Sequence, residues 1–316
     1  MTARTPAGVP PSHPRRRIAV VTGASSGIGE MTALGLARTG AHVVLACRSR
    51  ERGTAAVDRL HRLDTGGPMT GLLEVRELDL SDLASVRRFC AAWDYDRLDL
   101  LVNNAGIALA PFRRTVDGFE SHLGVNHLGP FALTGLLLPH LRRSSSPRVV
   151  TVTSEAQRFC RFRLEQLGTE RRYRPATAYL RSKRANLYFA MELQRKADVD
   201  GVPLLSVAIG PGLTRSHILH SDARAGRRGP LKRLLPRIVG LVGKSTELGA
   251  APSLYAATDP DVPGGSYVVP SGPLQQRGDP VLRHEPAMDD VHTARRLWEF
   301  SEEATGVRYR LAGAVA

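Results

Sequence analysis

Short runs of branched and aliphatic residues alternate along the chain with longer stretches in which apolar residues recur every three to four positions. Most of the short runs are nearly continuously apolar, which is typical of strands buried on both faces, and the longer stretches are typical of amphipathic helices. We predict strands at 18–21, 42–47, 74–78, 98–102, 148–153, 204–209 and 265–269, and helices at 30–38, 81–94, 116–141, 178–196, 245–257 and 288–305. This alternation predicts a single doubly wound α/β domain with a mostly parallel sheet.

A glycine-rich turn, Thr22-Gly-Ala-Ser-Ser-Gly-Ile-Gly29, connects the first predicted strand to the first helix. Gly23 permits a tight turn, Gly27 lets the backbone approach a pyrophosphate, and Gly29 lets the helix pack closely on the strand. The free N–H groups at the start of the helix then face the phosphates. We therefore predict a dinucleotide site here, which also includes Ser25, Ser26 and Ile28. The alternative is a glycine-rich turn that binds nothing.

The end of the second strand indicates which dinucleotide is bound. An acidic residue at this place would hold the ribose 2′-hydroxyl of NAD, but here Cys47 occupies it and Arg48 follows. An acid would repel a 2′-phosphate, whereas Arg can bind it. We therefore predict NADP(H) as the cofactor, with Arg48 as a ligand of its phosphate. The alternative is that Arg48 only caps a loop.

The ends of the next two strands carry further cofactor candidates. Asp79 and Leu80 follow the third strand, where the carboxylate can meet the adenine amino group and the leucine can cover the ring. Asn103-Asn104-Ala105-Gly106 follows the fourth strand. Its amides can brace the sheet, and Gly106 lets the cofactor ribose approach closely.

Tyr179 and Lys183 lie four residues apart in a predicted helix, so their side chains share one face. A positive charge beside a phenol favours the phenolate, so we expect Lys183 to lower the pKa of Tyr179 and make it a proton donor and acceptor near neutral pH. Of 44 basic residues only four are Lys, and Lys can exchange a proton where Arg stays charged. The alternative is a solvated helix with an incidental Tyr.

Composition excludes several other classes of protein. No apolar run is long enough to span a bilayer, and residues 1–17 form a basic, Pro-rich segment that we expect to be disordered. Three widely spaced cysteines suggest neither a zinc site nor paired disulfides, and favour a reducing, cytoplasmic setting. The net charge of +14 raises the alternative of nucleic-acid binding, but no segment interleaves aromatic residues with Arg.

Taken in order, these motifs resemble those of the short-chain dehydrogenase/reductase family. The resemblance covers roughly residues 18–216 and rests on 22–29, Asp79-Leu80, 103–106, Asn126, Ser154, Tyr179, Lys183 and Pro211-Gly212. It implies a Rossmann-type domain with a seven-stranded sheet, over residues 18–310, that transfers hydride between NAD(P) and a carbonyl or an alcohol. A small-molecule substrate is therefore expected, and no nucleic-acid partner. A non-catalytic NADP(H)-sensing protein on the same fold is the alternative.

The resemblance also assigns roles that the residues alone do not. It implies that Ser154, rather than Thr153, contacts the substrate oxygen, and that Asn126 holds a water that connects Lys183 to solvent. Pro211 and Gly212 would contact the nicotinamide, with Thr214 or Ser216 at the pyrophosphate. Residues 213–244 would form a substrate lid, apolar and basic enough to suggest a bulky lipophilic or acidic carbonyl compound; the alternative for this segment is a peripheral membrane surface.

Two further features match the retinol-dehydrogenase-like branch of this family. One is the segment Ala46-Cys-Arg-Ser49, and the other is an Arg-rich insertion between Ser154 and Tyr179, at 158–174. This insertion either guides an acidic substrate or, as we favour, is a solvated flap. The resemblance also implies a homodimer or homotetramer assembled through the helices that bear Asn126 and Tyr179.

Overall fold

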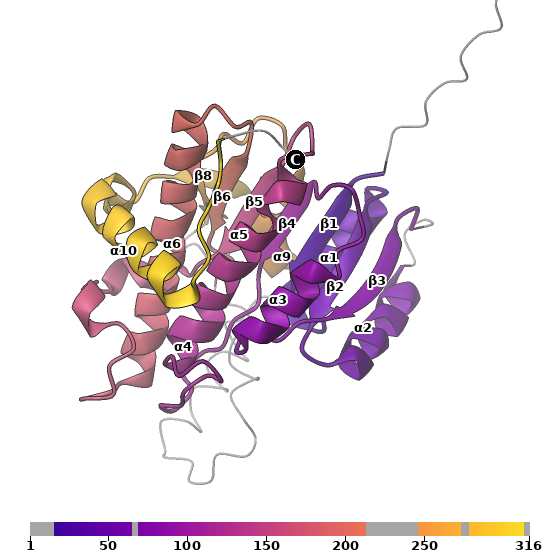
Figure 1. The fold of residues 1–316 in the computed structure, drawn as a ribbon. Coiled ribbons are helices and arrows are strands. Elements are labelled where there is room, and N and C mark those ends of the chain that lie inside the picture. Colours follow the sequence, from indigo (N-terminus) through magenta and orange to yellow (C-terminus); the bar gives the residue numbers. More distant parts are fainter. Residues whose placement is uncertain (1–15, 65–68, 213–245, 273–277, 313–316) are drawn as a thin grey trace, which may run out of the picture.

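The computed structural model describes residues 16–64, 69–212, 246–272 and 278–312. One eight-stranded sheet runs through it in the order β3-β2-β1-β4-β5-β6-β7-β8, with helices on both faces (Figure 1). All neighbouring strands are parallel except β7 and β8. The predicted doubly wound, mostly parallel α/β domain is confirmed.

The strands are β1 (Ile18–Thr22), β2 (His42–Cys47), β3 (Leu72–Glu77), β4 (Leu100–Asn103), β5 (Arg148–Val152), β6 (Leu205–Ile209), β7 (Tyr267–Pro270) and β8 (Pro280–Arg283). The α-helices are α1 (Gly27–Arg38), α2 (Arg50–Leu63), α3 (Leu83–Ala91), α4 (Ser121–Leu123), α5 (Gly129–Leu141), α6 (Pro175–Val199), α9 (Thr246–Thr258) and α10 (Val291–Thr305). Short 3₁₀ turns lie at η2 (Glu155–Phe159), η3 (Leu164–Gln166) and η5 (Pro286–Asp289), and η1 (Gly124–Leu128) is a π-helix.

Two apolar cores lie on opposite faces of the sheet. Because side chains alternate along a strand, Val21 of β1 packs with α1, α2 and α9, whereas Val20 packs with α3, α5 and α6. Both valines are fully buried. This double burial explains why the central strands are continuously apolar, and it leaves the carboxyl ends of the parallel strands as the edge where polar residues gather.

The structure adds two elements that the sequence patterns did not predict. In α2 only Gly53, Ala56 and Leu60 are buried, so its apolar face is too narrow and too small to give a clear periodic signal. The strand β8 pairs antiparallel with β7 at the edge of the sheet, and its side chains are mostly exposed. This edge strand makes the sheet eight-stranded rather than seven-stranded.

The predicted continuous helix over 116–141 is wrong at its start, over residues 116–120. Residues 114–120 form a turn closed by a bridge between Arg114 and Glu120, and helical structure begins only at Ser121. The chain then passes through the π-helix η1 before it continues as α5. The wider π turn contains Asn126, and such turns are frequent at functional sites.

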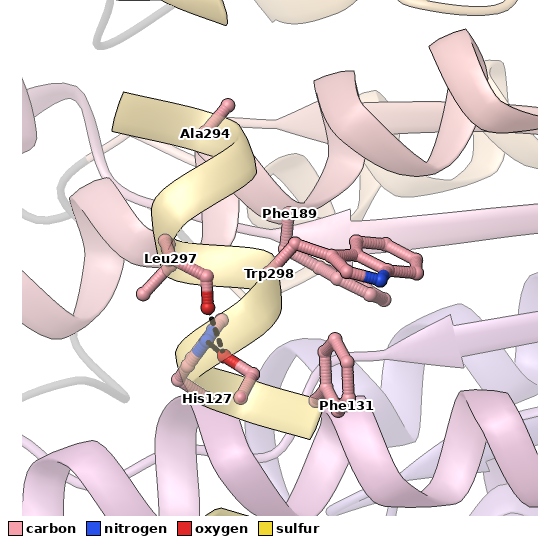
Figure 2. A pocket seen from close by; sticks show the side chains of 7 residues that line it. His127, Phe131, Phe189, Ala294, Leu297 and Trp298 are labelled. Atoms are coloured by element: carbon pink, nitrogen blue, oxygen red, sulfur yellow. Dashed lines mark hydrogen bonds between the residues drawn. The ribbon is translucent and has the colours of Figure 1, made fainter. Parts of the chain in front are cut away.

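The C-terminal helix α10 packs across α6 and α5. Trp298 stacks on Phe189 of α6 with ring centroids 5.9 Å apart, and meets Phe131 of α5 edge-on at 5.1 Å (Figure 2). The buried imidazole of His127 bonds to Ser301 of α10 at 2.8 Å. α10 therefore covers part of the face through which the resemblance implied that subunits assemble. Within the described residues, no helix combines the length and apolar character needed to cross a membrane.

Candidate active site

The glycine-rich turn lies between β1 and α1, as predicted. Gly23 and Gly27 have φ angles of +67° and +66°, in the left-handed region that glycine adopts without strain. A Cβ atom at Gly29 would lie 2.7 Å from the carbonyl oxygen of Gly23, so this close approach requires glycine. Ser25 and Ser26 are partly exposed in the same turn, whereas Ile28 is buried in the core. The turn has the backbone shape and helix start that a pyrophosphate needs.

Thr22 is a supporting residue that the sequence analysis missed. Its hydroxyl accepts hydrogen bonds from the N–H groups of Asn104 and Ala105, both at 3.0 Å, and the Asn104 side chain donates to the Thr22 carbonyl at 2.8 Å. The ends of β1 and β4 are thereby locked together. The sequence signal that could have identified Thr22 is its position: a hydroxyl-bearing residue directly before the first glycine of the turn.

The end of β2 lies against the same turn. Burial raises the pKa of Cys47 to about 11, with the nearby Ser25 side chain lowering it in part, so Cys47 remains a neutral thiol. Arg48 follows as an exposed cation. The end of β2 therefore presents a positive charge at position 48 and no acidic side chain at position 47 or 48. This is the arrangement that the NADP(H) prediction requires.

Asp79 and Leu80 differ in how well they fit their predicted roles. Asp79 is partly exposed, and its Oδ1 accepts hydrogen bonds from the backbone and hydroxyl of Ser81 at 2.9 and 2.7 Å. Leu80 is buried among residues of α3 and α5, and only 6% of its surface is exposed. Its side chain therefore packs mainly into the core, and its contact with an adenine ring stays a prediction.

Ser154, Tyr179 and Lys183 meet at the carboxyl end of β5. Ser154 is partly exposed two residues after that strand, whereas Thr153 is completely buried, which supports the choice of Ser154. Tyr179 and Lys183 both lie on α6, and the Ser154 side chain lies close enough to the Tyr179 phenol to influence its pKa. Lys183 donates to the carbonyl of Val152 at 3.0 Å. The structure therefore brings these three predicted residues together.

The prediction that Lys183 lowers the pKa of Tyr179 is wrong. Burial raises the pKa of Tyr179 to about 12; the nearby Ser154 side chain lowers it in part, and the charge of Glu155 raises it further. Burial also lowers the pKa of Lys183 to about 8. Both shifts have the same cause, because removal of water disfavours the charged form of either group.

Gly106 and Asn126 stand beside the Lys183 ammonium. Gly106 is exposed, and a Cβ atom there would lie 3.3 Å from Lys183 Nζ and 3.1 Å from Asn126 Oδ1. The Asn126 amide donates to Ile107 O at 3.0 Å and to Ser182 Oγ at 2.8 Å, and its oxygen accepts from Ile107 N at 2.8 Å. Asn126 thus ties the segment after β4 to α6, and its carbonyl keeps one lone pair for a water.

The turn after β6 contains Pro211 and Gly212, with Gly212 at φ +75°. Its N–H donates to Glu155 Oε1 at 3.0 Å, so Glu155 joins this turn to the turn that bears Ser154. Sequence reasoning gave Glu155 no role. Thr214, Ser216 and the lid predicted at 213–244 lie outside the described residues.

Comparison with known proteins identifies the family. A sequence model of the short chain dehydrogenases matches residues 17–225, about two thirds of the chain. Retinol dehydrogenase 14 of Homo sapiens is 37% identical over 305 residues, covering 91% of this chain and 86% of that protein. Dehydrogenase/reductase SDR family member 13 of Bos taurus is 41% identical over 302 residues, covering 93% and 74%.

Solved structures agree with this assignment. An uncharacterised protein from Mycobacterium paratuberculosis matches with a TM-score of 0.75 at 41% identity, covering 93% of this chain and 95% of that one. The RhlG/NADP active-site complex of Pseudomonas aeruginosa matches with a TM-score of 0.55 at 28% identity, covering 76% and 88%. The chain belongs to the short-chain dehydrogenase/reductase family, and among its members it is similar to the retinol dehydrogenases.

Proposed function

We propose that this protein is an NADP(H)-dependent oxidoreductase that reduces a carbonyl group on a bulky lipophilic compound. The observation that carries this proposal is the cluster of Ser154, Tyr179 and Lys183 beside the exposed Gly106. A matched relative in complex with NADP and the several relatives named retinol dehydrogenases support the choice of cofactor and of a lipophilic substrate.

The residues present fit this cofactor. The left-handed glycines and the start of α1 suit the pyrophosphate, and Arg48 is an exposed cation for the 2′-phosphate. Gly106 and Lys183 would hold the nicotinamide ribose, and Pro211 with Gly212 the nicotinamide, aided by Thr214 or Ser216. When bound, NADP(H) supplies or takes up the hydride.

The protein's own groups would handle the proton. With its pKa raised to about 12, Tyr179 keeps its proton at neutral pH and is a proton donor to a carbonyl oxygen. Ser154 donates a hydrogen bond to the same oxygen as negative charge develops on it. The ammonium of Lys183, one helical turn from Tyr179, then stabilises the phenolate that remains. This order of events favours reduction over alcohol oxidation at neutral pH.

A reducing, cytoplasmic setting is part of this proposal. The chain's three cysteines, Cys47, Cys90 and Cys160, are all free thiols. Fractionation of cells that express the full chain would test this placement, since the bulk of the protein should appear in the fraction free of membranes.

The function is tested by NADPH oxidation over a panel of ketones and aldehydes of increasing size and apolarity. We expect turnover with at least one bulky lipophilic carbonyl compound and, in Tyr179→Phe, a loss of kcat by roughly 10²–10⁴ with NADPH affinity retained. NADPH binding without turnover of any compound would favour the non-catalytic sensor instead. Activity of Tyr179→Phe near that of the wild type would contradict the assigned proton donor.

A further inference from the structure

A second buried polar cluster lies next to Tyr179 and has no part in the chemistry described above. His122 Nδ1 lies 2.9 Å from Glu120 Oε1 and 2.9 Å from the Tyr173 hydroxyl, and that hydroxyl lies 2.9 Å from the same Glu120 oxygen. Glu120 and His122 are buried, and Tyr173 is partly buried. The rings of His122 and Tyr179 meet in a T-shaped arrangement, with centroids 6.3 Å apart.

The cluster holds the backbone of Ala110 from both sides. The N–H of Ala110 donates to His122 Nε2 at 3.3 Å, and the Tyr173 hydroxyl lies 3.1 Å from the Ala110 carbonyl oxygen. Since Nε2 accepts this bond, the ring proton is assigned to Nδ1, directed at Glu120 and Tyr173. A protonated Nε2 would face the Ala110 N–H with a second donor.

Glu120 anchors the cluster as a charged group. Burial acts to raise the pKa of this carboxyl, but hydrogen bonds from the His122 side chain and from the backbone N–H groups of His122 and Leu123 outweigh it and hold the pKa below its ordinary value. The two backbone bonds are each 2.9 Å long. Glu120 is therefore ionised at neutral pH, and it fixes His122 in one tautomer and orientation.

Two strained residues flank the cluster. Leu109 and Arg172 have φ angles of +54° and +56°, and they are the non-glycine residues with positive φ in the part of the chain that the structure describes. Each directly precedes a member of the network, Ala110 in one case and Tyr173 in the other. Side chains rarely adopt this conformation, which persists where the surroundings hold it and is frequent at functional sites.

The insertion between Ser154 and Tyr179 therefore packs against the segment after β4 through its C-terminal end, although most of its Arg side chains are exposed to solvent. Tyr173 meets Phe112 edge-on with ring centroids 5.2 Å apart, and Arg114 lies 3.7 Å from Glu170. The side chains of Arg161, Arg163, Arg171, Arg172 and Arg174 are exposed, as expected for a solvated flap. The end of the insertion and the segment 107–114 thus pack against each other as one wall, and His122, which contacts both segments, lies against Tyr179.

We propose that Glu120, His122 and Tyr173 are positioning residues that lock this wall and so determine how a bulky substrate lies against Tyr179. The inference rests on the proposed function, because it assigns the wall to the substrate side of that site. Asn126 holds the start of the same segment at Ile107, and the network holds it three residues further on, at Ala110. Two anchor points, at Ile107 and at Ala110, would keep the segment fixed while large substrates enter and leave.

Tyr173→Phe tests the proposal because it removes the hydroxyl and keeps the ring that packs on Phe112. The matched control is Tyr188→Phe, which removes a hydroxyl bonded to Asp290 on another face of α6. We expect Tyr173→Phe to lower kcat/KM for the bulkiest carbonyl substrates about tenfold or more, mainly through KM. NADPH affinity and Tm should stay near those of the control, and the smallest substrates should be affected least.

Hydrogen–deuterium exchange supplies a readout that does not depend on turnover. Tyr173→Phe should increase deuterium uptake in peptides that cover 107–114 and 168–174 by several-fold, and Tyr188→Phe should leave them unchanged. Unchanged uptake would overturn the lock, as would a substrate-independent fall in kcat/KM that accompanies loss of NADPH binding. If the wild type reduces no carbonyl compound, the proposed function fails, and with it the substrate-side role, while the exchange result still decides whether the lock exists.

Discussion

The ammonium of Lys183 donates a hydrogen bond to the backbone carbonyl of Val152, 3.0 Å away, and Asn186, one turn further along α6, donates to the same oxygen at 3.1 Å. Both side chains are buried. Since Val152 lies two residues before Ser154, these bonds fix the position of α6 along β5. They therefore set the distance between Tyr179 and Ser154, on which the proposed proton transfer depends.

Protonation of Lys183 should control cofactor affinity. Burial lowers its pKa from 10.5 to about 8, so in the folded protein the ammonium loses its proton as the pH rises through about 8. We expect the Kd for NADPH, measured by fluorescence, to rise about tenfold between pH 7 and pH 9, because only a tenth of the ammonium remains one unit above its pKa.

The same shift has a consequence for stability. Between about pH 8 and 10.5 the unfolded chain binds a proton at Lys183 that the folded protein does not, so this group's contribution to the free energy of unfolding rises with pH in that window.

Lys183→Met should abolish the pH dependence of the NADPH Kd and this pH dependence of stability. A Kd of the wild type that stays constant from pH 7 to 10 would argue that the ammonium does not hold the cofactor.

Arg48 should decide the choice between NADP(H) and NAD(H). Arg48→Asp replaces a cation with an anion at the expected 2′-phosphate site, and a charge-assisted hydrogen bond contributes about 1.5–3 kcal/mol. The ratio of kcat/KM for NADPH to that for NADH should therefore fall by roughly tenfold to a hundredfold. Arg50→Asp is the matched control, since Arg50 is also exposed, two residues away. Equal NADPH-to-NADH ratios in the wild type and in Arg48→Asp would show that Arg48 does not bind the 2′-phosphate.

Glu155 should keep in place the turn after β6, at which we propose that the nicotinamide binds. Its carboxylate accepts from Gly212 N at 3.0 Å, and loss of a partner for a partly buried donor costs about 1–3 kcal/mol. Glu155→Ala should lower Tm and weaken NADPH binding, whereas Glu155→Gln, which retains an acceptor oxygen, should preserve most of both. Thermal melts with and without NADPH compare the two variants. A Gln variant as weak as the Ala variant would mean that the charge, and not the hydrogen bond, is what matters.

His127 should make the fold sensitive to mild acid. Burial lowers the pKa of this imidazole to about 4, so between about pH 6.5 and 4 the unfolded chain binds a proton that the folded protein excludes. The free energy of unfolding should fall by roughly 3 kcal/mol over this window, since one pKa unit corresponds to about 1.4 kcal/mol.

Denaturant titrations from pH 7 to 4 measure this effect. His127→Gln, which retains a donor for Ser301, should flatten the pH dependence, and the same change at the exposed His61 should leave it as in the wild type. Equal acid sensitivity of His127→Gln and the wild type would show that other groups cause it.

Much of the architecture could be predicted from the sequence, because its physical causes act within single segments of the chain. A strand buried on both faces must be apolar, as in β1, and a turn with Gly23 and Gly27 at positive φ requires glycine in the sequence itself. The spacing of Tyr179 and Lys183 likewise fixes a shared helical face. The family, the doubly wound sheet and the gathering of the candidate catalytic residues followed from these patterns.

Other properties of the site arise from contacts between segments that lie far apart in the chain, and these became visible only in the folded protein. The spacing of Tyr179 and Lys183 predicts a charged neighbour and hence a lowered pKa for Tyr179, but the packing that excludes water around Tyr179 raises its pKa instead. One such property is the π turn that contains Asn126. Another is the network in which Glu120, His122 and Tyr173 hold Ala110, which depends on contacts between the loop after β4 and the insertion. No periodicity or motif records such contacts, because hydrogen-bond partners and desolvation are set by how the elements pack and not by the order of residues within any one of them.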